Sequence, residues 1–135
     1  MIKRNLVRVQ EPVYAALRIV SGALFLCHGL QKLFGVGGQA IDFSAKPQLW
    51  IGGCIELVGG LAIALGLFTR CAAFVASGTM AVAYLQFHAR EFANLHWMPI
   101  VNHGELAVVY CFLFLFIATR GSGIASIDRA LKRDE

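Results

Sequence analysis

Four apolar stretches occupy most of this 135-residue chain, and each is close to the length that a membrane-spanning helix requires. They cover approximately residues 12–34, 49–68, 71–89 and 99–119. A helix needs about 20 apolar residues to cross the hydrocarbon core of a bilayer, whereas buried strands are shorter and are bounded by turn residues. The sequence therefore predicts an all-α, integral membrane protein, a single membrane domain over residues 1–135 folded as an antiparallel four-helix bundle.

The composition agrees with this fold class. Hydrophobic residues make up 58% of the chain, and the mean hydropathy of +0.66 is far above that of a soluble domain. The formal net charge is +4, but the basic residues are divided among the flanks of the apolar stretches and are not clustered on one aqueous face. We therefore expect the lipid bilayer to be the partner of this chain and exclude nucleic acid.

Short connections separate the apolar stretches. Gly35 to Gly38 ends the first stretch, and Thr69-Arg70 joins the second to the third, which must then form an antiparallel hairpin. Residues 94–98, followed by Pro99, separate the third stretch from the fourth.

The distribution of lysine and arginine predicts the orientation. Most of these residues precede the first stretch, lie between the second and third, or follow the fourth: Lys3, Arg4, Arg8, Arg70, Arg120, Arg129, Lys132 and Arg133. Only Lys32, Lys46 and Arg90 belong to the other side. The positive-inside rule then places both termini in the cytoplasm, in a multi-pass protein of the bacterial inner membrane. The first stretch is too long for an ordinary cleavable signal and should remain as a helix.

Glu56 is an ionisable residue in the middle of the second stretch, which otherwise carries no charge from Trp50 to Phe68. A charge at that depth costs several kcal/mol unless it is paired, hydrated or neutralised. We therefore expect Glu56 to face the protein interior and treat it as a functional-site candidate. The alternative is a protonated or paired carboxylate that only fastens helices together.

Further polar residues fall at a depth similar to that of Glu56. With a rise of 1.5 Å per residue, His28 lies near the outer end of the first stretch, and Asn102 and Glu105 lie within two turns of the outer end of the fourth. His88, at the outer end of the third stretch, completes a polar cluster from all four helices. Arg18 lies in the inner half, from which its long side chain can reach the cytoplasmic headgroups or Glu56.

Helical phase places polar and small residues on common faces of the first two stretches. The two predicted inward faces are Arg18, Ser21, Gly22, Phe25, His28, Gly29 and Lys32 in the first, and Gly52, Glu56, Gly59, Gly60 and Ile63 in the second. Because glycine allows neighbouring backbones to approach closely, we expect a tight helix contact around the carboxylate.

Several motifs in order along nearly the whole chain resemble the DoxX family of small four-span membrane proteins. In the first stretch an arginine is followed about ten residues later by His-Gly-x-x-Lys, within residues 17–35. The second stretch carries Ile-Glu-Leu-Val-Gly-Gly at 55–60, and the fourth begins with Asn-His-Gly-Glu at 102–105. The closing segment 121–128 is also similar to the tail of the family. The family positions matched are Arg18, His28, Lys32, Glu56 and Glu105.

The resemblance implies that the protein takes part in an oxidation–reduction reaction at the membrane. One branch of the family resembles the small subunit of thiosulfate:quinone oxidoreductase, and other branches are associated with quinone detoxification or with thiol and oxidative stress. The chain is accordingly expected to be a component of a membrane oxidoreductase, working with a soluble or membrane-bound redox partner protein.

A quinone site can also be built from the residues themselves. Quinone reduction needs an apolar slot, hydrogen-bond donors for the carbonyl oxygens and a source of protons. His28 and Lys32 lie one helical turn apart and can donate to one carbonyl oxygen. The hypothesised catalytic residues are Glu56, Glu105 and His28. The hypothesised binding residues are Arg18, His28, Lys32, Glu56, Asn102 and Glu105, with Phe25, Phe34 and Trp50 as apolar walls. The alternative for His28 and Lys32 is an interfacial role, in which Lys32 reaches the outer headgroups and His28 hydrogen-bonds to Glu56.

The chain contains no GxGxxG, CxxC or CxxCH motif, so its sequence supports neither a flavin, nor haem c, nor a redox dithiol. The sequence also contains no HxxxH or ExxH spacing, which would predict a metal site on one helix. Its four cysteines are scattered singly along the apolar stretches. If the first two helices are adjacent, Cys27 and Cys54 could form a thiol pair or a disulfide, and this alternative is kept.

Two other classes of function remain open at this stage. The first is a proton-coupled carrier of small solutes that uses Glu56 and Glu105, although the sequence shows no inverted repeat. The second is a non-catalytic anchor that assembles other proteins at the membrane. The sequence is compatible with a homo-oligomer but does not specify one.

Overall fold

The computed structural model describes residues 7–89 and 95–132, and within these ranges the protein is helical and contains no β-strand. This confirms the all-α prediction for the part of the chain that is described. Four basic residues used to predict the orientation, Lys3, Arg4, Arg90 and Arg133, lie outside these ranges.

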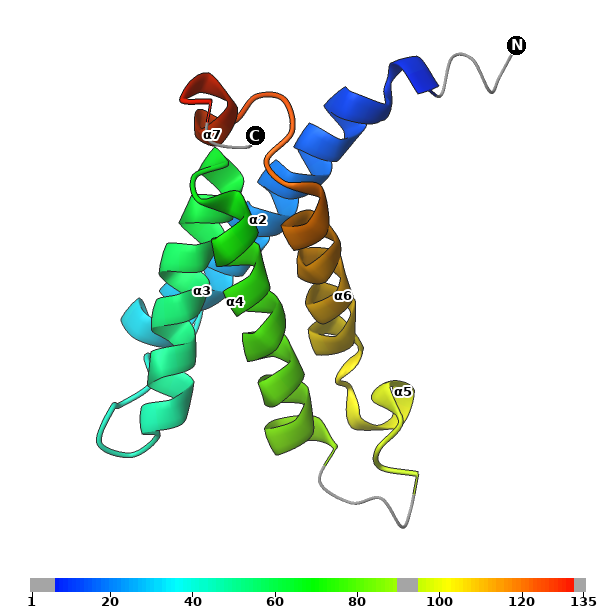
Figure 1. The fold of residues 1–135 in the computed structure, drawn as a ribbon. Coiled ribbons are helices and arrows are strands. Elements are labelled where there is room, and N and C mark those ends of the chain that lie inside the picture. Colours follow the sequence, from blue (N-terminus) through cyan, green and yellow to red (C-terminus); the bar gives the residue numbers. More distant parts are fainter. Residues whose placement is uncertain (1–6, 90–94, 133–135) are drawn as a thin grey trace.

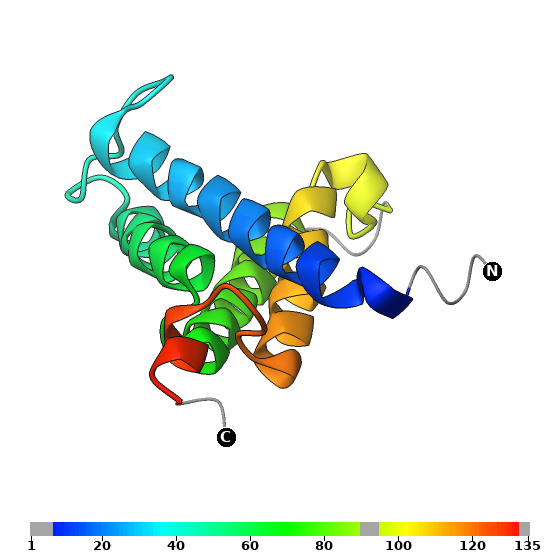
Figure 2. The same cartoon turned by 90° about the horizontal axis from the view of Figure 1, so that it is seen from above.

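Four longer helices form the body of the molecule (Figures 1 and 2). The elements are α2 (Gln10–Phe34), α3 (Pro47–Leu65), α4 (Thr69–Ala83), the π-helix η1 (Tyr84–His88), α5 (Pro99–Asn102), α6 (Glu105–Arg120) and α7 (Ile127–Ala130). α3 and α4 form an antiparallel hairpin, α2 packs along α3, and α6 packs beside α4. Gly35 ends α2 and Gly66 ends α3, both in the left-handed conformation, as glycine at a helix C-terminus allows.

By length and composition, two of the helices can cross a membrane: α2, with 25 residues, and α3, with 19. The third apolar stretch is a 15-residue α4 that continues directly into the five-residue η1. The fourth stretch is not one helix, because it breaks between α5 and α6. There His103 has a φ of 58°, and the side-chain oxygen of Asn102 accepts a hydrogen bond from the Gly104 N–H at 2.8 Å. The same N–H also donates to the carbonyl oxygen of Pro99 at 3.1 Å, so the asparagine side chain and Pro99 together satisfy a backbone group that has left the regular helix.

The contact between α2 and α3 is built on two pairs of glycines. Gly22 lies opposite Gly60, and Gly29 lies opposite Gly53, so both helices carry glycines seven residues apart at the contact. A Cβ atom at Gly22 would stand 2.5 Å from the backbone nitrogen of Ala64, and one at Gly60 would stand 2.7 Å from the carbonyl oxygen of Gly22. The backbones therefore touch, and the close contact predicted around Glu56 is confirmed. Of the glycines predicted on this face of α3, Gly60 lies at the contact, whereas Gly52 and Gly59 do not, because the buried face of α3 runs through Gly53.

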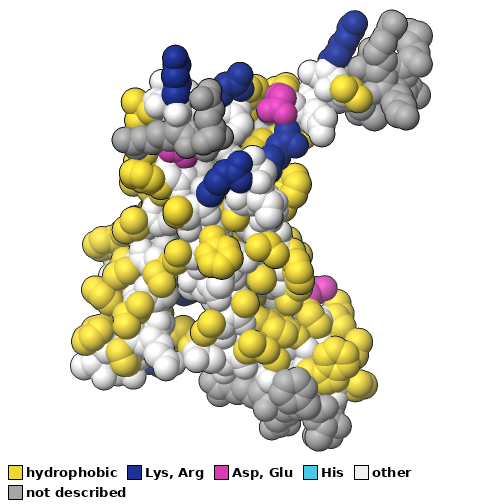
Figure 3. Space-filling model, in the orientation of Figure 1, with side chains coloured by type: hydrophobic (Ala, Val, Ile, Leu, Met, Phe, Trp, Pro, Cys, Tyr) yellow, Lys and Arg dark blue, Asp and Glu magenta, His cyan; other side chains and the backbone are white. Residues whose placement is uncertain are grey.

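The aromatic and aliphatic core lies between α2, α4 and α6, with one residue of α3, Ile63. It contains Tyr14, Phe25, Ile63, Ala73, Ala76, Met80, Tyr110, Phe114 and Ile117. The outer surface is also apolar: Val58, Phe74 and Phe112 are 67%, 64% and 66% exposed, and hydrophobic side chains cover much of the face shown in Figure 3. An aqueous surface with this many exposed large hydrophobic side chains is unfavourable, whereas a bilayer accommodates them.

The C-terminal segment folds back over the turn between α3 and α4 (Figure 1). The fully buried guanidinium group of Arg18 donates to the carbonyl oxygens of Ile63 at 2.6 Å and Ala125 at 2.7 Å. The carboxylate of Asp128 accepts two hydrogen bonds from Thr69, one from the threonine backbone N–H and one from the threonine hydroxyl group, at 2.8 Å each. Arg18 is thus too deeply buried to reach the headgroups, and it binds backbone carbonyl oxygens at the end of α3 and in the tail, whereas the ion-pair partner of Glu56 is Lys32.

Candidate functional site

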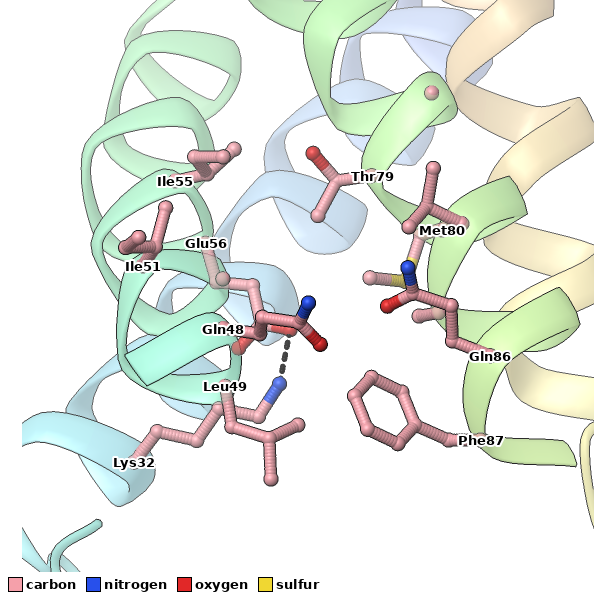
Figure 4. A pocket seen from close by; sticks show the side chains of 14 residues that line it. Lys32, Gln48, Leu49, Ile51, Ile55, Glu56, Thr79, Met80, Gln86 and Phe87 are labelled. Atoms are coloured by element: carbon pink, nitrogen blue, oxygen red, sulfur yellow. Dashed lines mark hydrogen bonds and ion pairs between the residues drawn. The ribbon is translucent and has the colours of Figure 1, made fainter. Parts of the chain in front are cut away.

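A pocket of about 450 Å³ lies between α3 on one side and α4 with η1 on the other (Figure 4). Most of its walls are apolar, and Lys32 from α2 and Glu56 from α3 meet within it. The side chains that line the pocket include Lys32, Gln48, Ile51, Ile55, Glu56, Thr79, Met80, Gln86 and Phe87. A pocket of this size that combines apolar walls with a few polar groups is typical of small-molecule sites.

Lys32 and Glu56 form an ion pair, with 2.5 Å between the lysine Nζ and the Oε1 of the carboxylate. The side chain of Glu56 is only 3% exposed, and that of Lys32 is 28% exposed. Lys32 lies in the last turn of α2, where a cation also interacts favourably with the helix dipole. Gly53 makes the approach feasible, since a Cβ atom there would stand 3.0 Å from the Cβ of Lys32.

The second oxygen of the carboxylate, Oε2 of Glu56, is buried and has no hydrogen-bond partner among the residues that the structure describes. A buried oxygen that lacks a donor is costly, by about 1–3 kcal/mol and more when it carries charge. Glu56 lines the pocket, so a donor on a bound molecule can satisfy this oxygen. The ion pair is therefore both a structural contact and an incomplete hydrogen-bonding site.

The structure separates the other predicted site residues from this pocket. His28 is half-buried and contacts the ring of Tyr110 edge-on, with 6.3 Å between ring centroids. The partner of Glu56 is Lys32, so the hypothesised pairings of Glu56 with His28 or Arg18 are not formed. Glu105 is exposed in the first turn of α6, where a carboxylate interacts favourably with the helix N-terminus.

Asn102 belongs to a second polar cluster at the junction of η1 and α5. Its side-chain amide donates to the carbonyl oxygen of His96 at 2.8 Å, and its own carbonyl oxygen contacts Nδ1 of His88 at 3.1 Å. Tyr84 stacks on His88 and donates to the carbonyl oxygen of Trp97. These contacts hold the connection in place, so Asn102 orders the chain outside the Lys32–Glu56 pocket.

The expected aromatic walls are also elsewhere. Phe25 is buried in the core, Phe34 is 66% exposed, and Trp50 packs edge-on against Phe43. The actual walls are aliphatic side chains of α3 together with Met80 and Phe87. Sequence reasoning missed the polar lining residues Thr79 and Gln86, although their spacing of seven residues places them on one face of the third stretch.

The cysteines do not join the site. All four are free thiols in the structure, and Cys27 is exposed while Cys54 is half-buried. Within residues 7–89 and 95–132, no three His, Cys, Asp or Glu side chains are grouped so as to hold a metal ion.

The structure describes a helical protein with an exposed apolar surface and a buried ion pair in a largely apolar pocket. The family model described as DoxX matches residues 13–89, more than half of the chain, and the protein belongs to the DoxX family. The matched segment contains Arg18, His28, Lys32 and Glu56 and ends before Glu105. The resemblance found in the sequence is thereby confirmed.

Three relatives extend this result. An uncharacterized protein of Haemophilus influenzae is 40% identical over 131 residues, which is 92% of this chain and 94% of the relative. "Inner membrane protein YqjF" of Escherichia coli is 31% identical, covering 86% of this chain and 89% of the relative. "Putative oxidoreductase CatD" of Bacillus subtilis is 26% identical, covering 83% and 81%. No solved structure matches the chain significantly.

We predict an asymmetric effect of breaking the ion pair. Lys32→Met should lower the free energy of unfolding in detergent by about 2–3 kcal/mol, because it leaves the buried Glu56 charge without its cation. Glu56→Gln should cost less, because the partly exposed Lys32 can turn toward water. The double variant should recover part of the loss. As a control, Glu105→Gln removes an exposed carboxylate and should change stability by about 0.5 kcal/mol or less. A Lys32→Met protein as stable as the wild type would contradict the pairing.

Proposed function

We propose that this protein is the membrane-embedded, quinone-binding component of an oxidoreductase, with the quinone ring held in the Lys32–Glu56 pocket. The observation that carries the proposal is the partnerless Oε2 of Glu56, buried in a pocket with otherwise largely apolar walls. The name of the Bacillus subtilis relative, "Putative oxidoreductase CatD", supports the reaction class.

We further propose four membrane crossings, by α2, by α3, by α4 with η1 and by α5 with α6, with both termini in the cytoplasm of a bacterial cell. The exposed aliphatic and aromatic surface supports insertion. Figure 3 shows Lys and Arg side chains gathered at the end of the molecule where Figure 1 places α7. The described basic residues that flank the helices on this side are Arg8 before α2, Arg70 in the first turn of α4, Arg120 in the last turn of α6, and Arg129 and Lys132 in and after α7. That asymmetry favours a cytoplasmic location for this end. The Escherichia coli relative is named an inner membrane protein, in agreement with this location.

This topology predicts opposite reactivity at the two ends. In a chain whose four native cysteines are replaced by alanine, Ser44→Cys, in the loop between α2 and α3, should react in intact cells with a membrane-impermeant maleimide. Ala130→Cys, exposed in α7, should react only after the cells are opened. Labelling of Ala130→Cys in intact cells would overturn the orientation.

The pocket offers complementary groups to both redox states of a quinone. The ammonium group of Lys32 can donate a hydrogen bond to a quinone carbonyl oxygen, and the free Oε2 of Glu56 can accept one from a quinol hydroxyl. Apolar contact with Ile51, Ile55 and Phe87 would hold the ring. An ionised carboxylate alone would repel a carbonyl oxygen, so the lysine is needed for the oxidised state.

Reduction of a quinone to a quinol consumes two electrons and two protons, one proton at each carbonyl oxygen. In the proposed assembly a redox partner protein supplies both electrons. As negative charge develops on the carbonyl oxygen, the adjacent Lys32 ammonium stabilises it and is placed to transfer a proton to it. Water that reaches the partly exposed Lys32 would supply the second proton and restore the lysine.

The proposal predicts which substitutions weaken quinone binding. For purified protein in nanodiscs, Lys32→Met should weaken the affinity for decylubiquinone by about tenfold or more, because it removes a charge-assisted hydrogen bond of roughly 1.5–3 kcal/mol to a carbonyl oxygen. Glu56→Gln should weaken the affinity for the reduced form, decylubiquinol, by a similar factor, because it removes the charged acceptor for a quinol hydroxyl. His28→Ala and Glu105→Gln, whose side chains lie outside the pocket, should bind as the wild type does. Wild-type nanodiscs that bind no more decylubiquinone than empty nanodiscs would refute the proposal and favour a non-catalytic anchor.

A further inference from the structure

Gly52 and Gly78 line the pocket, and neither helix packing nor backbone conformation requires glycine at these two positions. Among the 14 glycines of the chain, only Gly37, Gly52 and Gly78 have open space where a Cβ atom would stand. Gly37 has a φ of +74°, a backbone conformation that favours glycine. Gly52 in α3 and Gly78 in α4 are ordinary helical positions, and both line the Lys32–Glu56 pocket.

Glycine inside a helix is less favourable than alanine, because it orders a more flexible backbone. Gly22 and Gly60 offset this cost by letting α2 and α3 touch, which a Cβ atom would prevent. Gly52 and Gly78 make no such contact. What they provide is space: the pocket wall carries no side chain at these two positions, whereas neighbouring residues such as Ile51 and Thr79 line the pocket with theirs.

The pocket lies where α3 and α4 diverge from their shared turn at Gly66 (Figure 1). Its lining includes exposed side chains of both helices, such as Ile51 and Val82, so it opens at the apolar surface of the molecule. Inside it lies the 3% exposed carboxylate of Glu56, with its unpartnered oxygen. A ligand that satisfies this oxygen has to pass between the two helices.

We propose that Gly52 and Gly78 determine specificity by keeping a flat slot open between α3 and α4, through which a planar conjugated ring enters edge-first from the lipid and reaches Lys32 and Glu56. This inference rests on the proposed quinone-binding function and adds the shape of the substrate and its route. A flat ring fits beside the two positions that carry no side chain, whereas a puckered saturated ring of the same polarity needs more width.

The test compares glycine variants and two ligands in nanodiscs. Gly52→Ala and Gly78→Ala should each weaken decylubiquinone binding by about tenfold or more, since one added methyl group in a filled pocket has an effect of this size. Their thermal midpoints should equal or exceed that of the wild type, because the new methyl group meets open space. The wild type should also bind decylubiquinone at least about tenfold more tightly than a decyl-substituted cyclohexane-1,4-dione, which keeps two carbonyls on a non-planar ring.

Two control variants separate the slot from helix packing. Gly60→Ala should lower the thermal midpoint, because its Cβ would meet the backbone of α2, while Gly59→Ala should leave both stability and binding near wild type, since its Cβ would approach only Phe25, at 3.9 Å. Wild-type affinity in Gly52→Ala and Gly78→Ala, equal binding of the flat and puckered rings, or a lowered midpoint in both slot variants would overturn the inference. Absence of wild-type binding would instead refute the quinone proposal itself.

Discussion

The backbone contact between α2 and α3 is the constraint on which the site depends. Gly22 and Gly29 face Gly60 and Gly53, and no side chain separates the two helices at these points. Because the helices touch, Lys32 at the end of α2 can reach the carboxylate of Glu56 on α3. A larger residue at any of the four positions would move the lysine away and leave a buried charge unpaired.

The remaining helices turn this pair into a pocket. α4 meets α3 at the Gly66 turn, where Arg18 and Asp128 bind the backbone of the turn and the C-terminal segment. That end is therefore firmly held, whereas the opposite ends of α3 and α4 diverge and leave room for a ligand. Glycines serve two different purposes along α3: Gly53 and Gly60 bring helices together, and Gly52 keeps space free between them.

Much of the fold could be predicted from the sequence, because long apolar stretches and helical phase depend on local spacing. The helical class, the glycine C-terminus of α2, most of the inward-facing residues and the burial of Glu56 all follow from such spacing, although Gly53 and not Gly52 lies at the α2–α3 contact. The partner of Glu56 does not, because Arg18, His28 and Lys32 share one helix face, and the choice among them depends on how the helices are aligned along their axes. Helical phase also could not reveal that Asn102 interrupts the fourth stretch or that Glu105 lies outside the pocket.

Photo-crosslinking with an azidoquinone tests the central claim most directly, because it reports where the ring lies. With wild-type protein in nanodiscs, mass spectrometry should find the label on the pocket segments of α3 and of α4 with η1, residues 48–56 and 78–87, and excess decylubiquinone should abolish it. Lys32→Met, which lacks the donor for the quinone carbonyl oxygen, should lose most of this labelling. Labelling confined to α6, or spread evenly over the lipid-facing surface and unaffected by competitor, would contradict a quinone site at Lys32 and Glu56.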